Sequence, residues 1–254
     1  MAQHSQCRSV LITGTNRGIG LGLVRGLAAA SPSPELIIAT CRYPDKAQEL
    51  HQLCKQYRNI KILRLDVVSE NSINEVVKEV EGIVGPQGLN CLINNAGINV
   101  LASLDEVTAE TMLTVYKTNT VAQLMVSKAF LPLLRKAAQQ STGMGCHRAA
   151  IINMSSRSAC MQFVDVNDLA LGVYPYRIAK TALNMVTRCL AADLKSDGIL
   201  CISLHPGWIQ TDMGGKKAPL KIQDTIPSIL SVLAQLGEKD NGSFLDWQGK
   251  TLPW

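Results

Sequence analysis

The sequence predicts an α/β fold in which helices cover both faces of a doubly wound, parallel β-sheet. Short apolar runs alternate with longer segments of helical periodicity along nearly all of the 254 residues. Strands and helices that alternate in this way form βαβ units, and such units build a parallel sheet. A glycine-rich turn between the first apolar run and the first helix is typical of the Rossmann type of this fold. Since the chain has no internal repeat or low-complexity linker, residues 1–254 are predicted to form a single domain.

The strands are predicted at the apolar runs, which are rich in Val, Ile and Leu, as expected for strands buried on both faces. The predicted strands are residues 10–12, 36–39, 60–65, 91–93, 149–153, 199–204 and 242–245. Helices are predicted from the glycine-rich turn to about residue 30 and over 45–56, 70–84, 109–139, 176–195 and 225–236. Ser69 is a favourable N-cap for its helix, and Pro132 is expected to bend the longest one.

The composition narrows the class of protein. Hydrophobic residues make up 46% and aromatic residues 4% of the chain, so the core is expected to be aliphatic. The formal net charge of +5 is dispersed, with no basic run longer than Lys216-Lys217, which argues against a nucleic-acid partner. A mild cationic excess is better suited to a small anionic ligand.

The cysteines and the N-terminus indicate the compartment. The eight cysteines show neither a C-x-x-C pair nor a metal-binding spacing, so we expect reduced thiols and no bound metal. The first eight residues are polar and lack the apolar segment of a signal peptide. No apolar run approaches the length of a membrane span. We therefore expect a soluble, cytoplasmic protein.

The glycine-rich turn, residues 13–20, lies where a dinucleotide site is expected, between the first strand and the first helix. Gly14 permits a tight turn, Gly18 lets the backbone approach a pyrophosphate, and Gly20 allows close packing of helix on strand. The free N–H groups at the start of the helix would then face the phosphates. A glycine-rich turn without a ligand is the alternative. The candidate cofactor-binding residues here are Gly14, Asn16, Arg17, Gly18, Ile19 and Gly20.

The end of the second strand indicates which nicotinamide cofactor is preferred. A site for NAD usually has an acidic residue here that binds the ribose hydroxyls. This strand instead runs into Thr40-Cys41-Arg42, with no acidic residue before Asp45. Arg42 and Arg17 could bind a ribose phosphate through their planar guanidinium groups, and the alternative is that both are solvated charges. The sequence therefore favours NADP(H).

Polar residues also follow the next two strands. Asp66 and Val67 are expected to border the adenine, with Asp66 accepting a hydrogen bond from its amino group. After the fourth strand, Asn94, Ala96 and Gly97 lie where a ligand crevice is expected, beyond the carboxyl ends of the strands. For Asn94, the alternative is that its side chain only ties loops together.

Two tyrosine–lysine pairs have the spacing i, i+4 that places both side chains on one face of a helix. They are Tyr176/Lys180 and Tyr57/Lys61. A nearby ammonium lowers the pKa of a phenol, which can then exchange a proton with a substrate oxygen. Tyr176 begins a helix that follows a strand with a serine, Ser156, at its end, whereas Tyr57 lies away from the crevice. Tyr176 and Lys180 are therefore the predicted catalytic pair.

The combination of these motifs resembles the classical short-chain dehydrogenases/reductases over essentially the whole chain. The matching motifs are Thr13-Gly-x-x-x-Gly-x-Gly20, Asn94-Asn-Ala-Gly97, Asn119, Ser156, Tyr176-x-x-x-Lys180 and Pro206-Gly207. Within this family, the chain is most similar to the sniffer-type carbonyl reductases, through residues 204–215 and its C-terminal segment, 236–254.

The resemblance implies a role for each matching residue. Tyr176 would be the general acid, and Ser156 would orient and polarise the substrate carbonyl. Lys180 would bind the nicotinamide ribose and lower the pKa of Tyr176. Asn119 would hold a water that links Lys180 to solvent, and Thr211 would contact the nicotinamide end of the cofactor. The other candidate cofactor-binding residues in the second half of the chain are Tyr176, Lys180, Pro206, Gly207 and Ile209.

The segment between Ser156 and Tyr176 is longer than is usual in the family. We expect the additional residues, around 162–174, to line or cover the substrate entrance. The longer segment also leaves Ser155 and Ser158 as alternatives to Ser156.

Together, the motifs and the resemblance predict an NADPH-dependent reductase of aldehydes or ketones that works by direct hydride transfer. The alternative is a catalytically silent protein that senses NADP(H) and regulates a partner. The expected substrate is a small, hydrophobic carbonyl compound, bound by residues 99–103, 162–174 and 211–225. The helices over 109–139 and 176–195 could form the face of a homodimer.

Overall fold

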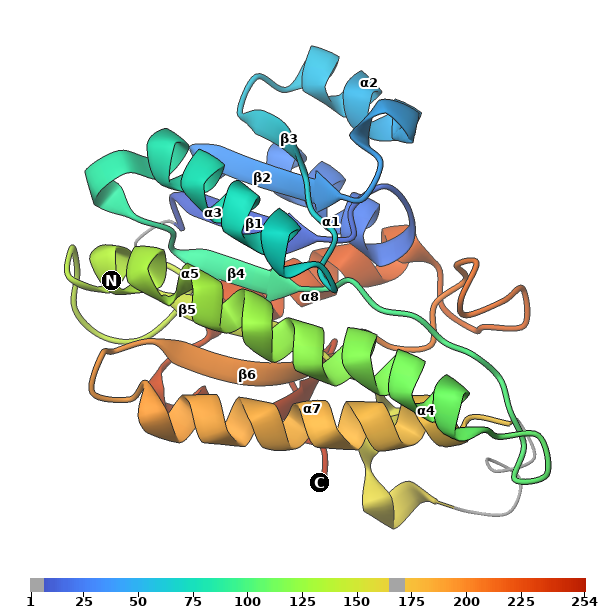
Figure 1. Ribbon diagram of the computed structural model, residues 1–254. Coiled ribbons are helices and arrows are strands. Elements are labelled where there is room, and N and C mark those ends of the chain that lie inside the picture. The colour runs from blue at the N-terminus through green and yellow to red at the C-terminus, as the bar shows by residue number, and fades with distance from the viewer. Residues whose placement is uncertain (1–6, 165–171) are drawn as a thin grey trace.

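Seven parallel strands form one sheet in the computed structural model, which describes residues 7–164 and 172–254 (Figure 1). The strand order is β3-β2-β1-β4-β5-β6-β7. The strands are β1 (Ser9–Thr13), β2 (Leu36–Cys41), β3 (Ile60–Arg64), β4 (Cys91–Asn94), β5 (Ala150–Met154), β6 (Leu200–His205) and β7 (Phe244–Asp246). Each strand lies close to its predicted position, so the predicted doubly wound parallel sheet is confirmed.

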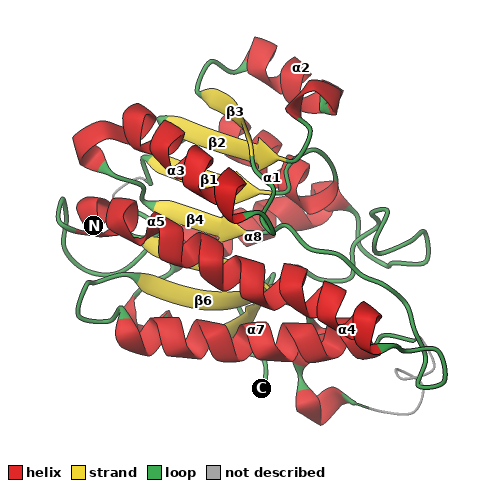
Figure 2. Ribbon diagram, in the orientation of Figure 1, coloured by secondary structure: helices red, strands yellow, loops and turns green. Residues whose placement is uncertain are grey.

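Helices cover both faces of the sheet, as Figure 2 shows. They are α1 (Gly18–Ala29), α2 (Gln48–Gln56), α3 (Glu70–Val84), α4 (Ala109–Tyr116), α5 (Ala122–Ala138), α7 (Tyr174–Asp193) and α8 (Ile222–Gln235). Within the described parts of the chain, none of them is both long enough and apolar enough to cross a membrane.

The two faces of the sheet are buried in two separate apolar clusters. Successive side chains of a strand point to opposite faces. In β1, Val10 and Ile12 therefore belong to the cluster that includes residues of α1, α2 and α8, whereas Leu11 belongs to the one that includes residues of α3, α5 and α7. This arrangement explains why the strands read as continuous apolar runs and not as an alternation of apolar and polar residues.

The helix predicted over 109–139 is present over 109–138, but it is not α-helical throughout. A π-helical turn, Lys117–Val121, separates α4 from α5, and Pro132 lies inside α5. The turn contains Asn119, whose buried side chain bonds both main-chain groups of Ile98. The extra residue of a π turn shifts which side chains face inward, and such turns are frequent at functional sites. The helix predicted from residue 176 also begins two residues earlier, with Pro175 in the first turn of α7.

The carboxyl ends of β1 and β4 form the switch point of this fold, because the strand order proceeds in opposite directions from them. β1 pairs with β2 on one side and with β4 on the other. Ligands of open α/β sheets bind in the crevice beyond the strand ends at such a point. The glycine-rich turn after β1 and the residues after β4 therefore face the same crevice (Figure 1).

Candidate active site

The glycine-rich turn connects β1 to α1 with the geometry that its sequence predicts. Gly14 has a φ of +70°, a conformation that residues with a side chain rarely adopt. Gly20 lies so close to the turn that a Cβ there would clash with the carbonyl oxygen of Gly14. The first turn of α1 therefore approaches the end of β1 closely, and its free N–H groups face the crevice. Asn16 is exposed on this turn, and Gly18 and Ile19 are partly exposed.

Asn95 and Thr13 hold the glycine-rich turn against the end of β4. The Asn95 Nδ2 atom donates to the carbonyl oxygens of Thr13 and Gly14, at 2.8 and 3.1 Å. In return, the Thr13 Oγ1 atom accepts from the backbone N–H groups of Asn95 and Ala96, at 3.0 and 2.9 Å. The sequence reasoning missed the role of Asn95, although its place between two candidate residues, Asn94 and Ala96, was a usable signal.

The side chain of Asn94 lies in the interior and not in the crevice. It is 1% exposed, and its Nδ2 atom donates to Asn153 Oδ1 and Ser127 Oγ, both at 2.8 Å. These bonds join β4 to β5 and α5. The geometry therefore favours the alternative role that the sequence left open for Asn94, a structural tie, while the neighbouring Ala96 lies against Gly14.

The two arginines predicted to bind a ribose phosphate are both exposed. Arg42 follows β2 directly, and its guanidinium carbon lies 6.0 Å from the centroid of the Tyr43 ring. Arg17 is the N-cap residue of α1, and its Nη1 atom lies 2.6 Å from Asp212 Oδ2. The sequence did not reveal this ion pair, because its partners are 195 positions apart.

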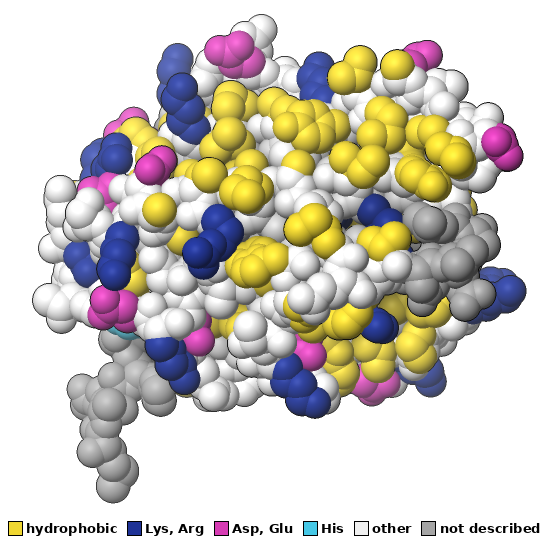
Figure 3. Space-filling model, turned by 90° about the horizontal axis from the view of Figure 1, so that it is seen from below, with side chains coloured by type: hydrophobic (Ala, Val, Ile, Leu, Met, Phe, Trp, Pro, Cys, Tyr) yellow, Lys and Arg dark blue, Asp and Glu magenta, His cyan; other side chains and the backbone are white. Residues whose placement is uncertain are grey.

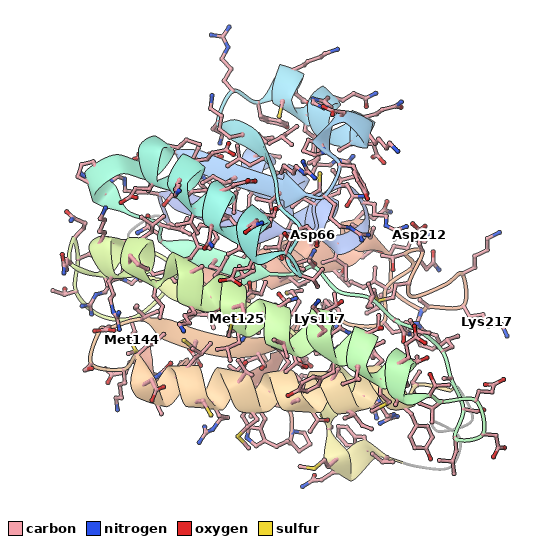
Figure 4. The ribbon with its side chains drawn as sticks, viewed as in Figure 1. Asp66, Lys117, Met125, Met144, Asp212 and Lys217 are labelled. Atoms are coloured by element: carbon pink, nitrogen blue, oxygen red, sulfur yellow. The ribbon has the colours of Figure 1, made fainter. Side chains whose placement is uncertain are left out.

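Asp66 and Val67 follow β3 on the same side of the sheet. The Asp66 Oδ1 atom accepts a hydrogen bond from the backbone N–H of Val68 at 3.2 Å, and the residue remains partly exposed. Val67 lines a hollow of about 430 Å³, whose lining also includes Lys117 and Met125. Figure 4 shows Asp66 and Lys117 toward the carboxyl ends of the strands, far from Met144 at the opposite edge. Asp66 therefore keeps a free oxygen near the crevice.

Three serines near the end of β5 differ in where they lie. Ser155 is buried, and its hydroxyl donates to Asn184 Oδ1 at 2.7 Å, so it is held in the interior. Ser156 Oγ instead accepts from the backbone N–H of Ser158 at 3.1 Å and forms a hydrogen bond with Tyr176. This contact with Tyr176 distinguishes Ser156 from the two serines that the sequence left as alternatives.

Tyr176 and Lys180 lie on one face of α7, as their spacing predicts. The Lys180 Nζ atom is 5.7 Å from the centroid of the Tyr176 ring and donates to the carbonyl oxygen of Met154 at 2.6 Å. The other pair with this spacing is divided, since Tyr57 is the C-cap of α2 and Lys61 lies in β3.

The predicted lowering of the Tyr176 pKa by Lys180 is wrong for this structure. Burial of the hydroxyl raises the pKa of Tyr176 to about 12, although part of the residue is exposed, and the hydrogen bond with Ser156 only partly opposes the rise. Burial also lowers the pKa of Lys180 to about 8. The cause is the same for both groups, because removal from water disfavours the charged form of each.

Asn119 and Gly97 lie beside Lys180. Asn119 is fully buried, and its Oδ1 and Nδ2 atoms bond the backbone N–H and carbonyl oxygen of Ile98 at 2.9 and 2.7 Å. A Cβ at Gly97 would lie 3.1 Å from Asn119 Oδ1 and 3.8 Å from Lys180 Nζ. The π-helical turn and the end of β4 therefore meet at the lysine, with both polar atoms of the Asn119 side chain in use.

The segment after β6 lies against the glycine-rich turn. Gly207 has a φ of +92°, next to Pro206, and Ile209 is buried and bridged to Leu220. Thr211 lies across from Gly18, where an added Cβ would be 3.6 Å from the Thr211 methyl carbon. The segment thus brings Thr211 to the glycine-rich turn, and its contact with the nicotinamide end of the cofactor stays a prediction.

The structure describes only part of the longer segment before α7. Residues 165–171, within the predicted entrance 162–174, lie outside the described residues. The described end of this segment is joined to the predicted pocket, because the backbone N–H of Ala102 donates to the carbonyl oxygen of Gly172 at 2.6 Å.

This combination of a glycine-rich turn at the switch point with Ser156, Tyr176 and Lys180 beside it is that of a nicotinamide-dependent oxidoreductase. Residues 8–221 match the family model described as short chain dehydrogenase, and the chain belongs to this family. The family resemblance predicted from the motifs is therefore confirmed.

Several proteins that are similar to this chain are oxidoreductases. It is 44% identical to the carbonyl reductase Sniffer of D. melanogaster, with a TM-score of 0.94 over 98% of this chain and 100% of that one. The same four values apply to an NADPH-bound carbonyl reductase from chicken fatty liver. The oxidoreductase C663.09c of Schizosaccharomyces pombe is 30% identical over 96% of both chains.

The pKa of Lys180 predicts how the stability of the protein without added cofactor depends on pH. Because its folded-state pKa of about 8 lies below the ordinary value of 10.5, the unfolded chain binds this proton more tightly. The contribution of this group to stability therefore rises with pH above about 8. At about 1.4 kcal/mol per pH unit, the gain between about pH 7 and pH 9.5 is roughly 2 kcal/mol. We expect wild type to gain this much relative to Lys180→Met in urea unfolding.

The control for this measurement is Lys216→Met, which removes an exposed lysine. Its difference from wild type should stay constant over the same pH range. A constant difference between wild type and Lys180→Met would contradict the assignment of the shifted pKa to Lys180.

Proposed function

We propose that this protein is an NADPH-dependent reductase of aldehydes or ketones and that residues 1–254 act as one catalytic domain. The chain belongs to the short chain dehydrogenase family, and the similar chicken enzyme is a carbonyl reductase that binds NADPH. The observation that carries the proposal is the hydrogen bond between Ser156 and Tyr176, with Lys180 behind the phenol ring. This arrangement supports proton transfer to a substrate oxygen.

Tyr176 would donate the proton to the carbonyl oxygen. When bound, NADPH supplies the hydride for the carbonyl carbon. With a pKa of about 12, the Tyr176 hydroxyl is protonated at neutral pH, which is the form that a general acid requires. The hydroxyl of Ser156 accepts from the Ser158 N–H and bonds Tyr176, so it is held beside the phenol, where it would polarise the substrate carbonyl.

Lys180 would position the cofactor ribose and return the proton. Its ammonium uses one N–H on the Met154 carbonyl, which leaves two N–H groups for ribose hydroxyls. A pKa of about 8 keeps most of the group protonated at neutral pH and lets it pass a proton on. Because both polar side-chain atoms of Asn119 bond Ile98, the proposed water would bind a main-chain group of the π-helical turn.

The substrate class is proposed to be hydrophobic carbonyl compounds. Apolar side chains are exposed on the three segments predicted to form the pocket or on residues next to them. Leu101 is 67% exposed, Met161 64% and Met213 48%. Exposed large apolar side chains near a crevice favour an apolar ligand. We also propose a cytoplasmic location, since all eight cysteines are free in the structure, as expected in a reducing compartment.

The helices α4, α5 and α7 are proposed to form a homodimer face. Several apolar side chains on them are exposed, and Figure 3 shows hydrophobic side chains gathered on the face seen from below. The residues are Leu113, Tyr116, Val121, Met125, Ile178 and Met185. An exposed apolar face of this kind favours association with another protein surface.

Tyr176→Phe is expected to lower kcat/KM for carbonyl reduction by a hundredfold or more, because the proton donor is removed. Binding of NADPH, followed by its fluorescence, should remain close to that of wild type. Tyr57→Phe is the matched control, because it removes the hydroxyl of the other tyrosine with a lysine at i+4. Undiminished turnover by Tyr176→Phe would refute its role as acid. If the wild-type protein fails to oxidise NADPH with every carbonyl compound tested, the result would support the silent sensor instead.

Arg42→Asp is expected to shift the preference from NADPH towards NADH. Loss of a charge-assisted hydrogen bond and a new repulsion of the ribose phosphate should change the ratio of the two kcat/KM values by roughly tenfold or more. Arg58→Asp makes the same charge change at an exposed arginine elsewhere and serves as control. If the ratio is the same in both variants, Arg42 does not select the cofactor.

Met185→Glu is expected to convert a homodimer into monomers, because the interface would then bury a charge. Sedimentation velocity of wild type and variant measures the change. Ile83→Glu, on an exposed position of α3, is the control that should leave the dimer intact. A monomeric wild-type protein would contradict the proposed dimer face.

A further inference from the structure

An ion pair joins the glycine-rich turn to the segment that follows β6. Arg17 Nη1 and Asp212 Oδ2 are 2.6 Å apart, and both side chains are mostly exposed, at 69% and 73%. The neighbouring residues of each partner also meet, since the Thr211 methyl lies across from Gly18. The glycine-rich turn and the segment after β6, which are far apart in the sequence, therefore lie side by side at the same part of the crevice.

Asp212 is presented by a braced turn. The backbone N–H of Gly215 donates to the carbonyl oxygen of Thr211 at 2.8 Å, and Trp208 Nε1 donates to the carbonyl oxygen of Gly214 at 2.8 Å. Figure 4 shows Asp212 on the side of the sheet where Asp66 lies, with Lys217 further out. These bonds fix the main chain on either side of Asp212, so the residue lies beside the glycine-rich turn.

This position is unfavourable for a second anion. Arg17 is one of the two residues proposed to bind the ribose phosphate of NADP(H), and its guanidinium is a donor that this phosphate would need. A carboxylate that already bonds the Arg17 guanidinium repels such a phosphate and occupies one of its donors. A ribose without the phosphate does not need this donor.

We propose that Asp212 is a specificity-determining residue that competes with the ribose phosphate of NADP(H) for Arg17. The inference rests on the proposed function, in which Arg17 contacts that phosphate. Competition weakens the binding of NADP(H) and leaves that of NAD(H) unchanged. Binding of the phosphate would also affect the segment that carries Thr211. A phosphate bonded to Arg17 breaks the ion pair with Asp212, and this pair is one of the contacts that hold the segment.

The test is the dissociation constant of NADPH and of NADH, measured by nicotinamide fluorescence, for four proteins: wild type, Asp212→Asn, Arg17→Gln and the double variant. Asp212→Asn is expected to bind NADPH about two- to fivefold more tightly, the range for an exposed ion pair. Its affinity for NADH should not change. In a protein that already carries Arg17→Gln, Asp212→Asn should change the dissociation constant of NADPH no more than the control substitution Glu49→Gln does.

Glu49→Gln is the matched control. Glu49 pairs with Arg25, also on α1, at 3.2 Å, and the two side chains are 59% and 56% exposed. The substitution therefore removes the same charge from an equivalent pair away from the crevice.

Three outcomes would overturn the inference. The first is that Asp212→Asn binds NADPH no more tightly than Glu49→Gln does. The second is that Asp212→Asn gains as much affinity for NADH as for NADPH. The third is that the substitution raises the NADPH affinity just as much when Arg17 has been replaced by Gln. Each is distinct from failure of the proposed function, in which the wild-type protein itself would not bind NADPH.

Discussion

The hydrogen bond from Lys180 to the carbonyl oxygen of Met154 is the contact on which the rest of the site depends. A buried ammonium is costly unless it is bonded, and this bond of 2.6 Å ties α7 to the last residue of β5. The helix carries Tyr176 one turn before the lysine, and the strand delivers Ser156 two residues after Met154. One buried contact therefore helps to set the distance between the hydroxyl groups of Ser156 and Tyr176, which are proposed to face the substrate.

A row of buried polar side chains across the sheet also holds α7 against β5 and so stabilises this contact. Asn94, Asn153 and Ser203 are aligned across β4, β5 and β6 by the register of the sheet. Asn153 Nδ2 and Ser203 Oγ both donate to Thr187 Oγ1, at 2.9 and 2.8 Å, so the row also holds α7. Buried polar groups that are bonded in this way fix a unique arrangement, because a shift of the helix would leave several of them unpaired.

The sequence predicted the fold, the shape of the glycine-rich turn and the shared helix face of Tyr176 and Lys180, because these depend on local patterns. The apolar runs, the N-cap at Ser69 and the place of Gly14 each follow from a few adjacent residues. The raised pKa of Tyr176 and the pair of Arg17 with Asp212 depend instead on contacts between distant segments. The π-helical turn at Lys117–Val121 was missed for a related reason, since Asn119 finds its partner in Ile98 after β4.

The two halves of the crevice differ in their exposure to water, and this difference divides their tasks. Around Arg17 and Arg42 the charges are exposed, so their interactions are weak, screened by salt and open to exchange between one anion and another. Around Lys180 and Tyr176 burial lowers the pKa of the lysine to about 8 and raises that of the tyrosine to about 12, and perturbed values of this kind are typical of sites of proton transfer. Cofactor selection can therefore be adjusted at the exposed end without disturbing the buried groups that position the hydroxyls of Ser156 and Tyr176.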